Sequence, residues 1–270
     1  MINSYRAAPG IDVLTTTFPI PGFGAVPINA FVLHGPEPVL VDTGPVIERA
    51  EFLTALRGVI DPRDLAWIWL THTDFDHIGA LQQLLEENAR LKVLATFLSV
   101  GIMSLSAPLP LDRIHLLNPG QQITLPDRTL TAFRPPTFDN PATMGFYDSK
   151  SGALFSSDCF GALLSDSDAP HNASDLSAEE LREGQVFWTT LDSPWLHTTD
   201  TGQFAQQLAA IRKIDPAITL SSHLPAAPGR LTERFLGTLA SVPEAQPFTG
   251  PDQAALEQML AQMTGDPGPG

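Results

Sequence analysis

The chain has 270 residues, and 43% of them are apolar, which is enough to bury a substantial core. Its 15 lysine and arginine residues are outnumbered by 30 aspartate and glutamate residues, giving a formal net charge of −15. Because this charge repels phosphate backbones and anionic membrane surfaces, the composition argues against nucleic acid as a partner.

The sequence carries no signal for secretion or membrane insertion. Cys159 is its single cysteine, so no internal disulfide can form. Residues 1–10 lack the basic and apolar regions of a signal peptide, and no apolar run approaches the roughly 20 residues of a spanning helix. We therefore expect a cytoplasmic protein that has no membrane segment.

The first elements alternate short strands with helices. Residues 28–33 and Val39–Val41 are short, β-branched runs on either side of the turn-forming segment 35–38, which predicts a hairpin at the edge of a sheet. After a glycine turn, Phe52 and Leu56 follow at helical spacing. The unit is a strand, a turn and a helix.

The same order then repeats around a polar run. Residues 67–70 predict a buried strand, and residues 78–85 carry leucines at the spacing of a helix. The polar residues 72–77 therefore lie in a strand-to-helix loop.

A region richer in strands follows. Residues 130–133, 143–147 and Ala153–Phe155 predict three strands, and Ser177 begins a capping box at the start of a helix. Another short apolar run, Ile218–Leu220, predicts a strand near the end of this region. This part again mixes strands and helices.

No linker divides the chain, so we expect a single domain over residues 1–262. Residues 263–270 include two prolines and three glycines and predict a flexible tail. Two successive mixed halves of strands and helices predict an α/β fold, with two sheets packed together and helices outside.

The polar run holds four residues of metal-ligating type: His72, Asp74, Asp76 and His77. A loop that follows a buried strand can turn all four side chains inward. The alternative is a solvated loop in which Asp74 or Asp76 caps the next helix and the histidines are incidental. The density of ligand-type residues favours a metal site.

The same run resembles a known family. Residues 71–77 read THTDFDH and resemble the His-x-His-x-Asp-His motif of the metallo-β-lactamase superfamily, with Asp74 in place of the middle histidine. A carboxylate at this place is typical of the flavodiiron proteins and their single-domain oxygen-binding relatives. Residues 139–147 and 154–161 are similar to two further elements of that branch. The resemblance covers residues 27–223 and implies the αβ/βα four-layer sandwich.

The resemblance also implies ligands for two metal ions. One ion would be bound by His72, Asp74 and Asp139. The other ion would be bound by Asp76, His77 and His223. Asp158 would bridge the two ions, and Asp76 and Asp158 are the residues expected to act in catalysis. Asp139 stands where that branch has a histidine.

Other interpretations of the later ligands stay open. Asp139 could be an ordinary turn residue, Asp158 a helix cap and His223 a surface-loop histidine.

The ligand chemistry favours iron, with zinc or manganese as alternatives, because carboxylates are hard donors and imidazole suits all three metals.

The first functional hypothesis is a non-haem di-iron protein that binds or reduces O2 or a similar small diatomic. The segment after His223 is too short for a flavin domain, so turnover would require a separate electron-donor protein. The resemblance also implies that two copies of the chain could form a homodimer.

A second hypothesis is a hydrolase of the same superfamily. Two metals can lower the pKa of a bridging water, which then attacks the ester, thioester, lactone or amide of a small-molecule substrate. A third is a metal-bound binding protein without turnover. Under the first two the chain would be an enzyme, either a metal-dependent oxidoreductase or a hydrolase.

Several other residues could belong to the site. Asp42 matches a superfamily position that supports the ligand loops, although turn chemistry explains it equally well. His171, Trp195 and His197 lie in stretches where this fold shapes access to its metals. Phe75 is either a wall of the pocket or a wedge in the core.

Overall fold

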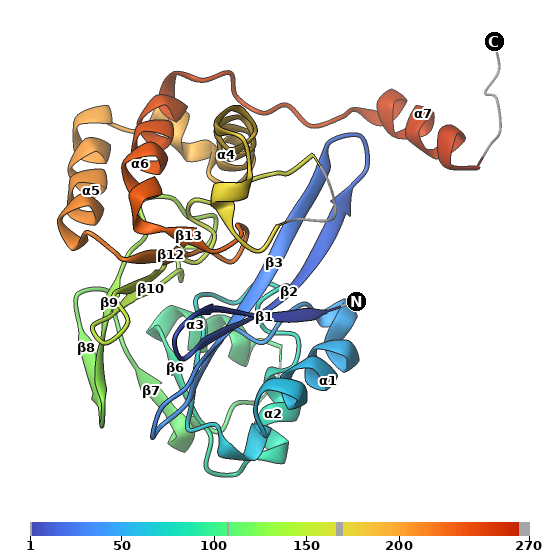
Figure 1. Cartoon of the computed structure of the whole chain (residues 1–270). Coiled ribbons are helices and arrows are strands. Elements are labelled where there is room, and N and C mark those ends of the chain that lie inside the picture. Colours follow the sequence, from blue (N-terminus) through green and yellow to red (C-terminus); the bar gives the residue numbers. More distant parts are fainter. Residues whose placement is uncertain (1, 107, 166–169, 265–270) are drawn as a thin grey trace.

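The computed structural model describes residues 2–106, 108–165 and 170–264. Two β-sheets pack face to face, and helices cover the outer face of each sheet (Figure 1). This order of layers is the αβ/βα four-layer sandwich expected from the sequence. Within the described ranges, no helix is long and apolar enough to cross a membrane.

The first sheet has seven strands, and their spatial order is their order in the chain. The strands are β1 (Asn3–Ala8), β2 (Ile11–Ile20), β3 (Gly24–Leu33), β4 (Val39–Val41), β5 (Trp67–Trp69), β6 (Lys92–Ala95) and β7 (Ile114–Leu116). Strands β4 to β7 run parallel to one another. The loops that follow β4, β5 and β6 therefore emerge at one edge of the sheet.

The predicted hairpin forms, but its predicted place at a sheet edge is wrong. β3 and β4 pair antiparallel, while β2 and then β1 add on the far side of β3. β2 pairs with β3 along its whole length, from Ile11 opposite Leu33 to Ile20 opposite Gly24. The threonines at 15–17 interrupt the apolar pattern of β2, so the sequence pattern does not predict this strand.

The second sheet has six strands in the order β13, β12, β11, β10, β9, β8. Their bounds are β8 (Gln122–Leu125), β9 (Arg128–Phe133), β10 (Gly145–Asp148), β11 (Ala153–Phe155), β12 (Ile218–Leu220) and β13 (Ala227–Pro228). The four strands predicted in this region correspond to β9, β10, β11 and β12. β11 and β12 are parallel, so the loops after them leave the sheet side by side.

The core between the sheets follows from the alternation of side chains along each strand. Phe31 of β3 and Trp69 of β5 face the second sheet, whereas their neighbours Val32 and Ile68 face the helices on the other side. Phe155 of β11 meets Phe31 with ring centroids 5.4 Å apart. Apolar residues on both faces of the strands thus hold the layers together.

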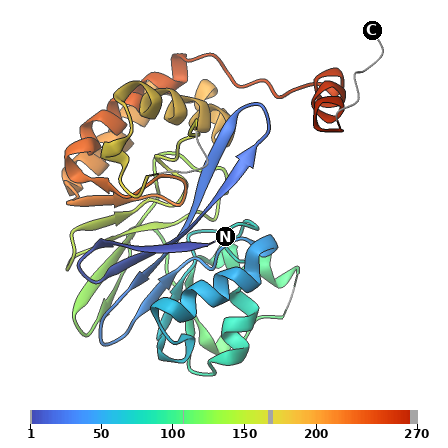
Figure 2. The same cartoon turned by 45° about the vertical axis from the view of Figure 1, so that its right-hand side comes forward.

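Helices cover the outer face of each sheet (Figure 2). The first sheet is covered by α1 (Arg49–Val59), α2 (Leu81–Glu87) and α3 (Phe97–Ser104). The second is covered by α4 (Ala178–Asp192), α5 (Thr201–Ile214) and α6 (Thr232–Ser241). The predicted helix start is confirmed at α4, where the Ser177 hydroxyl caps the helix by accepting a hydrogen bond of 3.1 Å from the Glu180 N–H. The Glu180 carboxylate accepts a hydrogen bond from the Ser165 hydroxyl.

Helix α2 begins later than the helix predicted over residues 78–85. Residues 75–80 form turns instead, and the Gly79 N–H donates to the Gly44 carbonyl at 2.7 Å. A Cβ at Gly79 would lie 2.5 Å from that carbonyl oxygen, so only glycine allows this approach. The ligand loop is therefore pinned to the turn after β4.

A seventh helix, α7 (Gln253–Thr264), lies apart from α4, α5 and α6 at the end of an extended segment (Figures 1 and 2). It extends through the first two residues of the segment for which a flexible tail is expected. The remaining residues, 265–270, lie outside the described ranges.

Candidate metal centre

The loop after β5 is anchored by Asp42, which follows β4. The carboxylate of Asp42 accepts hydrogen bonds from the N–H and the hydroxyl of Thr71, at 2.8 and 2.7 Å. It also lies 2.9 Å from Nδ1 of His77. Asp42 has a positive φ of 58°, a conformation that aspartate tolerates better than most residues. One buried carboxylate therefore fixes both ends of the ligand loop, which is the supporting role expected for it.

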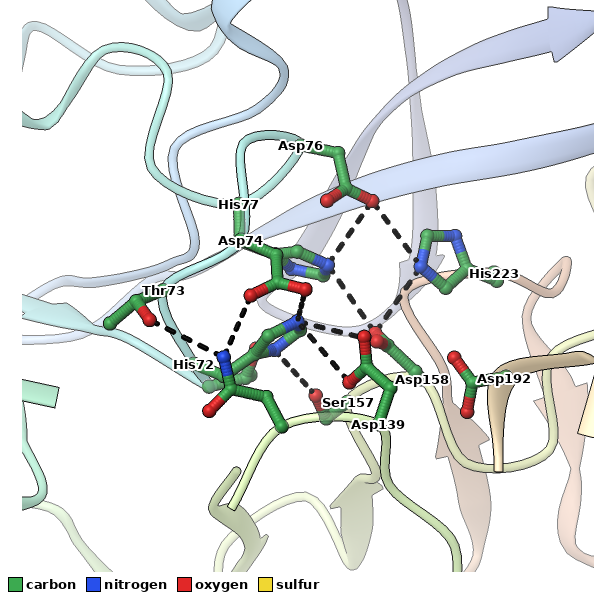
Figure 3. A network of polar contacts seen from close by, with 12 residues as sticks. His72, Thr73, Asp74, Asp76, His77, Asp139, Ser157, Asp158, Asp192 and His223 are labelled. Atoms are coloured by element: carbon green, nitrogen blue, oxygen red, sulfur yellow. Dashed lines mark hydrogen bonds and ion pairs between the residues drawn. The ribbon is translucent and has the colours of Figure 1, made fainter. Parts of the chain in front are cut away.

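Three histidines each direct their Nε2 atom toward the carboxylate of Asp158 (Figure 3). Nδ1 of His77 is held by Asp42, Nδ1 of His223 lies 2.8 Å from the carbonyl oxygen of Pro27, and Nδ1 of His72 lies 3.2 Å from a serine hydroxyl. Nε2 of each ring is thus the nitrogen that faces the site. In metal-bound histidines the nitrogen away from the metal is commonly engaged in this way.

Asp158 lies between these histidines. Its Oδ2 is 3.3 Å from Nε2 of His72, and its Oδ1 is 3.3 Å from Nε2 of His77 and 3.2 Å from Nε2 of His223. The side chain is only 4% exposed. Each oxygen faces a different histidine group, as the carboxylate of a bridging ligand does.

The first ligand group consists of Asp76, His77 and His223. Asp76 Oδ2 lies 3.3 Å from Nε2 of His77 and 3.4 Å from Nε2 of His223. His223 follows β12, and its loop is held by Asn29 of β3, whose side chain donates to backbone carbonyls on both sides of His223 at 2.9 and 2.8 Å. The first sheet therefore positions a ligand that the second sheet supplies.

The second ligand group consists of His72, Asp74 and Asp139. Asp74 Oδ2 and Asp139 Oδ1 each lie 3.9 Å from Nε2 of His72. Asn140 donates a hydrogen bond of 2.7 Å to Asp74 Oδ1, which ties the Asp139 loop to the loop after β5. In both groups the ligand atoms lie within 4.8 Å of one another.

The structure thus brings all seven sequence-predicted ligands together. They come from loops after β5, β9, β11 and β12, so both sheets contribute. Figure 3 shows their side chains converging on the centre.

The ionisable side chains in this cluster shift one another's pKa values. Burial alone would lower the pKa of His223, but Asp158 and Asp76 raise it to about 9. Burial and the nearby carboxylates, Asp158 foremost, raise the pKa of Asp139 to about 8. Burial would also raise the pKa of Asp158, yet the three histidines hold it well below its usual range. Metal ligands must be deprotonated, so a metal ion that binds here would release protons from the groups whose pKa is raised.

Two residues at the centre were missed in the sequence. Asp192, the last residue of α4, joins Asp139 and Asp158 in a further group whose ligand atoms lie within 4.8 Å of one another. Trp188, one turn earlier, donates from its indole N–H to the Asp158 carbonyl at 3.3 Å, and its ring lies 4.6 Å from that of His223. Neither residue belongs to a local sequence motif. The one feature of the sequence that could point to Asp192 is its position as an acidic residue at the C-terminus of a helix.

The other sequence candidates lie at varied distances from the centre. Trp195 donates to the Phe138 carbonyl at 2.8 Å and so supports the loop of Asp139. His171 stacks on Tyr5 with ring centroids 4.1 Å apart, on a residue of β1 that belongs to neither ligand group. Phe75 is 78% exposed, so the interpretation as a core wedge is wrong.

The side chains present fit a pair of metal ions. Nε2 of His72 and Nε2 of His77 are buried and have no hydrogen-bond partner, which is costly unless a cation binds there. Four carboxylates balance the charge of two divalent ions, and hard oxygen donors combined with imidazole suit iron.

A family model described as "ODP family beta lactamase" matches residues 26–220. The chain belongs to this family. Relatives of this ODP-family chain include "Diflavin flavoprotein A 1" of Synechocystis, 29% identical over 134 residues, which are 49% of the chain and 23% of the relative. "Rubredoxin-oxygen oxidoreductase" of Megalodesulfovibrio gigas is 25% identical over 140 residues, which are 52% of the chain and 35% of the relative.

Solved structures show the same fold. A flavo di-iron protein of Thermotoga maritima, in a mutant form, aligns with a TM-score of 0.75 at 18% identity, covering 93% of the chain and 64% of the matched protein. Rubredoxin oxygen:oxidoreductase of Desulfovibrio gigas aligns with a TM-score of 0.73 at 17% identity, covering 91% and 63%. The ODP-family chain thus spans less than two thirds of these proteins.

Proposed function

We propose that the chain is a non-haem di-iron protein that binds or reduces dioxygen or a similar small diatomic such as nitric oxide. The observation that carries the proposal is the convergence of three histidine Nε2 atoms on the buried carboxylate of Asp158, with further carboxylates on both sides. A carboxylate that faces two ligand groups supports a pair of ions rather than one.

The proposed ligands divide into two sets that share Asp158. One ion would be held by the second ligand group, which is His72, Asp74 and Asp139. The other ion would be held by the first ligand group, which is Asp76, His77 and His223. Bound iron would supply the one-electron chemistry that amino-acid side chains lack. The chain's part is to hold the ions at a fixed separation and to keep each imidazole oriented, which Asp42 does for His77.

The names of the relatives support the choice of chemistry, since they include a rubredoxin-oxygen oxidoreductase and flavo di-iron proteins. Because the chain matches only part of those proteins, the supply of electrons by a separate donor protein belongs to the proposal. So do a cytoplasmic location and pairing with a second copy. The chain's single cysteine, Cys159, is buried and forms no internal disulfide, which is compatible with such a location.

The first experiment is the metal content of the protein, measured by plasma mass spectrometry after purification without added metal or chelator. We expect about two irons per chain in the native protein and a loss of both in Asp158→Asn, because that change removes the shared charged ligand. Asp175→Asn removes an exposed carboxylate outside the ligand groups and should leave the iron content unchanged.

The second measurement exposes the reduced, iron-loaded protein to oxygen or nitric oxide in an anaerobic stopped-flow instrument. A new absorption band that is absent in Asp158→Asn would support the proposal. Native protein that contains only zinc, or iron that does not respond to either gas, would contradict it.

A further inference from the structure

Helix α4 brings a residue to the metal centre that the proposed ligand set does not use. Asp192 ends this helix, and its carboxylate faces Asp158 and His223 from the side opposite the ligand loop of the first sheet (Figure 3). Its carboxylate accepts a hydrogen bond of 3.0 Å from the hydroxyl of Ser193. No arginine or lysine among the described residues pairs with it.

The position of this carboxylate is electrostatically unfavourable by itself. The C-terminal end of a helix carries partial negative charge from its free carbonyl groups, which disfavours an acidic side chain in the last turn. The last turn of α4 contains no basic residue that would offset this effect. A second unfavourable interaction comes from Asp139 and Asp158, whose ligand atoms lie within 4.8 Å of that of Asp192. A bound cation would be attracted by the helix terminus and by the carboxylates, and would offset both effects.

The helix is held firmly in this position. A Cβ at Gly184 would lie 2.1 Å from the Leu163 carbonyl oxygen, so α4 packs directly on the backbone of the segment after β11. Gln185 donates to the Phe160 carbonyl at 3.0 Å, and Trp188 donates to the Asp158 carbonyl at 3.3 Å. Residues 185, 188 and 192 share one face of the helix, so contacts along this face set the location of the Asp192 carboxylate.

A separate observation indicates that the place between these carboxylates takes a cation. Nε2 of His72 is fully buried and has no hydrogen-bond partner, and it faces Oδ2 of Asp158 at 3.3 Å and Oδ1 of Asp139 at 3.9 Å. A buried imidazole nitrogen without a hydrogen-bond partner costs free energy unless a cation or another partner reaches it. Asp139 and Asp192 offer the further oxygens that a metal ion beside Asp158 would need.

We propose that Asp192 is an additional metal-binding residue, contributed by α4 to the ion that Asp139 and Asp158 also hold. Asp139 contributes one short carboxylate to this ion, and Asp192 supplies a further donor on that side. The inference rests on the proposed two-metal centre. It adds a fifth carboxylate, which makes the site more negative and favours an ion of higher charge.

The test compares Asp192→Asn with the native protein in direct titrations with Co²⁺, whose visible absorption reports the number and kind of ligands. Asparagine keeps the shape and can still accept the hydrogen bond from Ser193. We expect one of the two ions to bind at least about 10-fold more weakly, as loss of a ligand or of its close partner typically produces. The absorption spectrum of that ion should change as well.

Glu183→Gln is the matched control, because Glu183 is an exposed carboxylate on the same helix. It should leave both affinities and the spectrum unchanged. Thermal unfolding of the metal-free proteins checks folding, and Asp192→Asn should unfold at a temperature no lower than the native protein, since it removes repulsion within the cluster. A crystal structure of the loaded native protein should place an Asp192 oxygen about 2.0–2.2 Å from an ion.

The outcomes separate the two proposals. If the native protein binds two ions and Asp192→Asn binds them with the same affinities and spectrum, the role of Asp192 is refuted and the two-metal centre stands. If the native protein binds no metal, both are refuted. A selective weakening with a changed spectrum, absent in Glu183→Gln, supports the assignment.

Discussion

At the scale of single residues, Asp42 shows how a side chain that touches no ion can determine metal binding. Its carboxylate receives two hydrogen bonds from Thr71 and lies 2.9 Å from Nδ1 of His77. An imidazole that donates Nδ1–H to a carboxylate keeps its Nε2 free and more basic. The ligand quality of His77 therefore depends on a residue 35 positions earlier in the chain.

We predict that Asp42→Asn lowers metal affinity by about 10-fold to 100-fold, because the amide cannot support the same tautomer of His77 as strongly. Competition with a chelator of known affinity measures this effect. Asp61→Asn, at an exposed helix cap away from the ligands, is the comparison variant and should retain native affinity. If Asp42→Asn binds metal with the affinity of the native protein, the ligand loop keeps its geometry without the carboxylate and the prediction is wrong.

Residue by residue, the sequence predicted the ligands that lie in a motif or directly after a strand. His72 and His77 stand in one short run, and His223 follows an apolar strand. Asp192 and Trp188 could not be predicted, because a helix that is distant in sequence brings them to the centre only through tertiary packing. Spacing along the chain carries no information about that packing.

At the scale of elements, α4 depends on glycine where it crosses the segment after β11. A Cβ at Gly184 would collide with the Leu163 carbonyl, whereas a Cβ at Gly58 in α1 would meet nothing within 4 Å. The same substitution therefore has opposite effects in the two helices.

We predict that Gly184→Ala destabilises the fold by about 1–3 kcal/mol through overpacking. Gly58→Ala should instead stabilise it by up to about 1 kcal/mol, because alanine is the better helix former. Urea unfolding followed by circular dichroism measures both. Gly184→Ala should also weaken metal binding, since α4 must shift together with Trp188. A stable Gly184→Ala protein with native affinity would mean that the helix adapts without cost.

Element prediction failed where local patterns and tertiary contacts disagree. The helix predicted over residues 78–85 starts later, because Gly79 packs against the turn after β4. β2 is not evident in the sequence because the polar threonines at 15–17 interrupt its apolar pattern, although the strand pairs with β3 along its whole length. Short buried strands such as β11 were predicted well, since both of their faces are apolar.

At the scale of the whole molecule, the metal-free centre should make stability depend on pH. The pKa of His223 is raised to about 9 in the fold from an ordinary value of 6.5. A group whose pKa rises on folding stabilises the protein fully below its unfolded pKa and loses that contribution as pH rises through the folded one. The pKa of Asp139, raised to about 8, acts in the same direction.

We therefore predict that the metal-free protein becomes less stable between about pH 6.5 and 9, as measured by urea unfolding in the presence of a chelator. Metal should bind more tightly over the same range, because the ligands must release their protons. At ion concentrations 1,000 times the dissociation constant, binding should add about 4 kcal/mol to the free energy of unfolding. A metal-free stability that is constant across this range would contradict the proton-filled centre.

The ligands reach the centre from both sheets, with His72 and His77 on the first and Asp158 and His223 on the second. Neither half of the sandwich can assemble a complete coordination sphere by itself. A chain cut in two between the halves would regain high-affinity metal binding only when the fragments recombine. The colour of a bound transition metal would then serve as an optical reporter of correct assembly, readable without any assay of turnover.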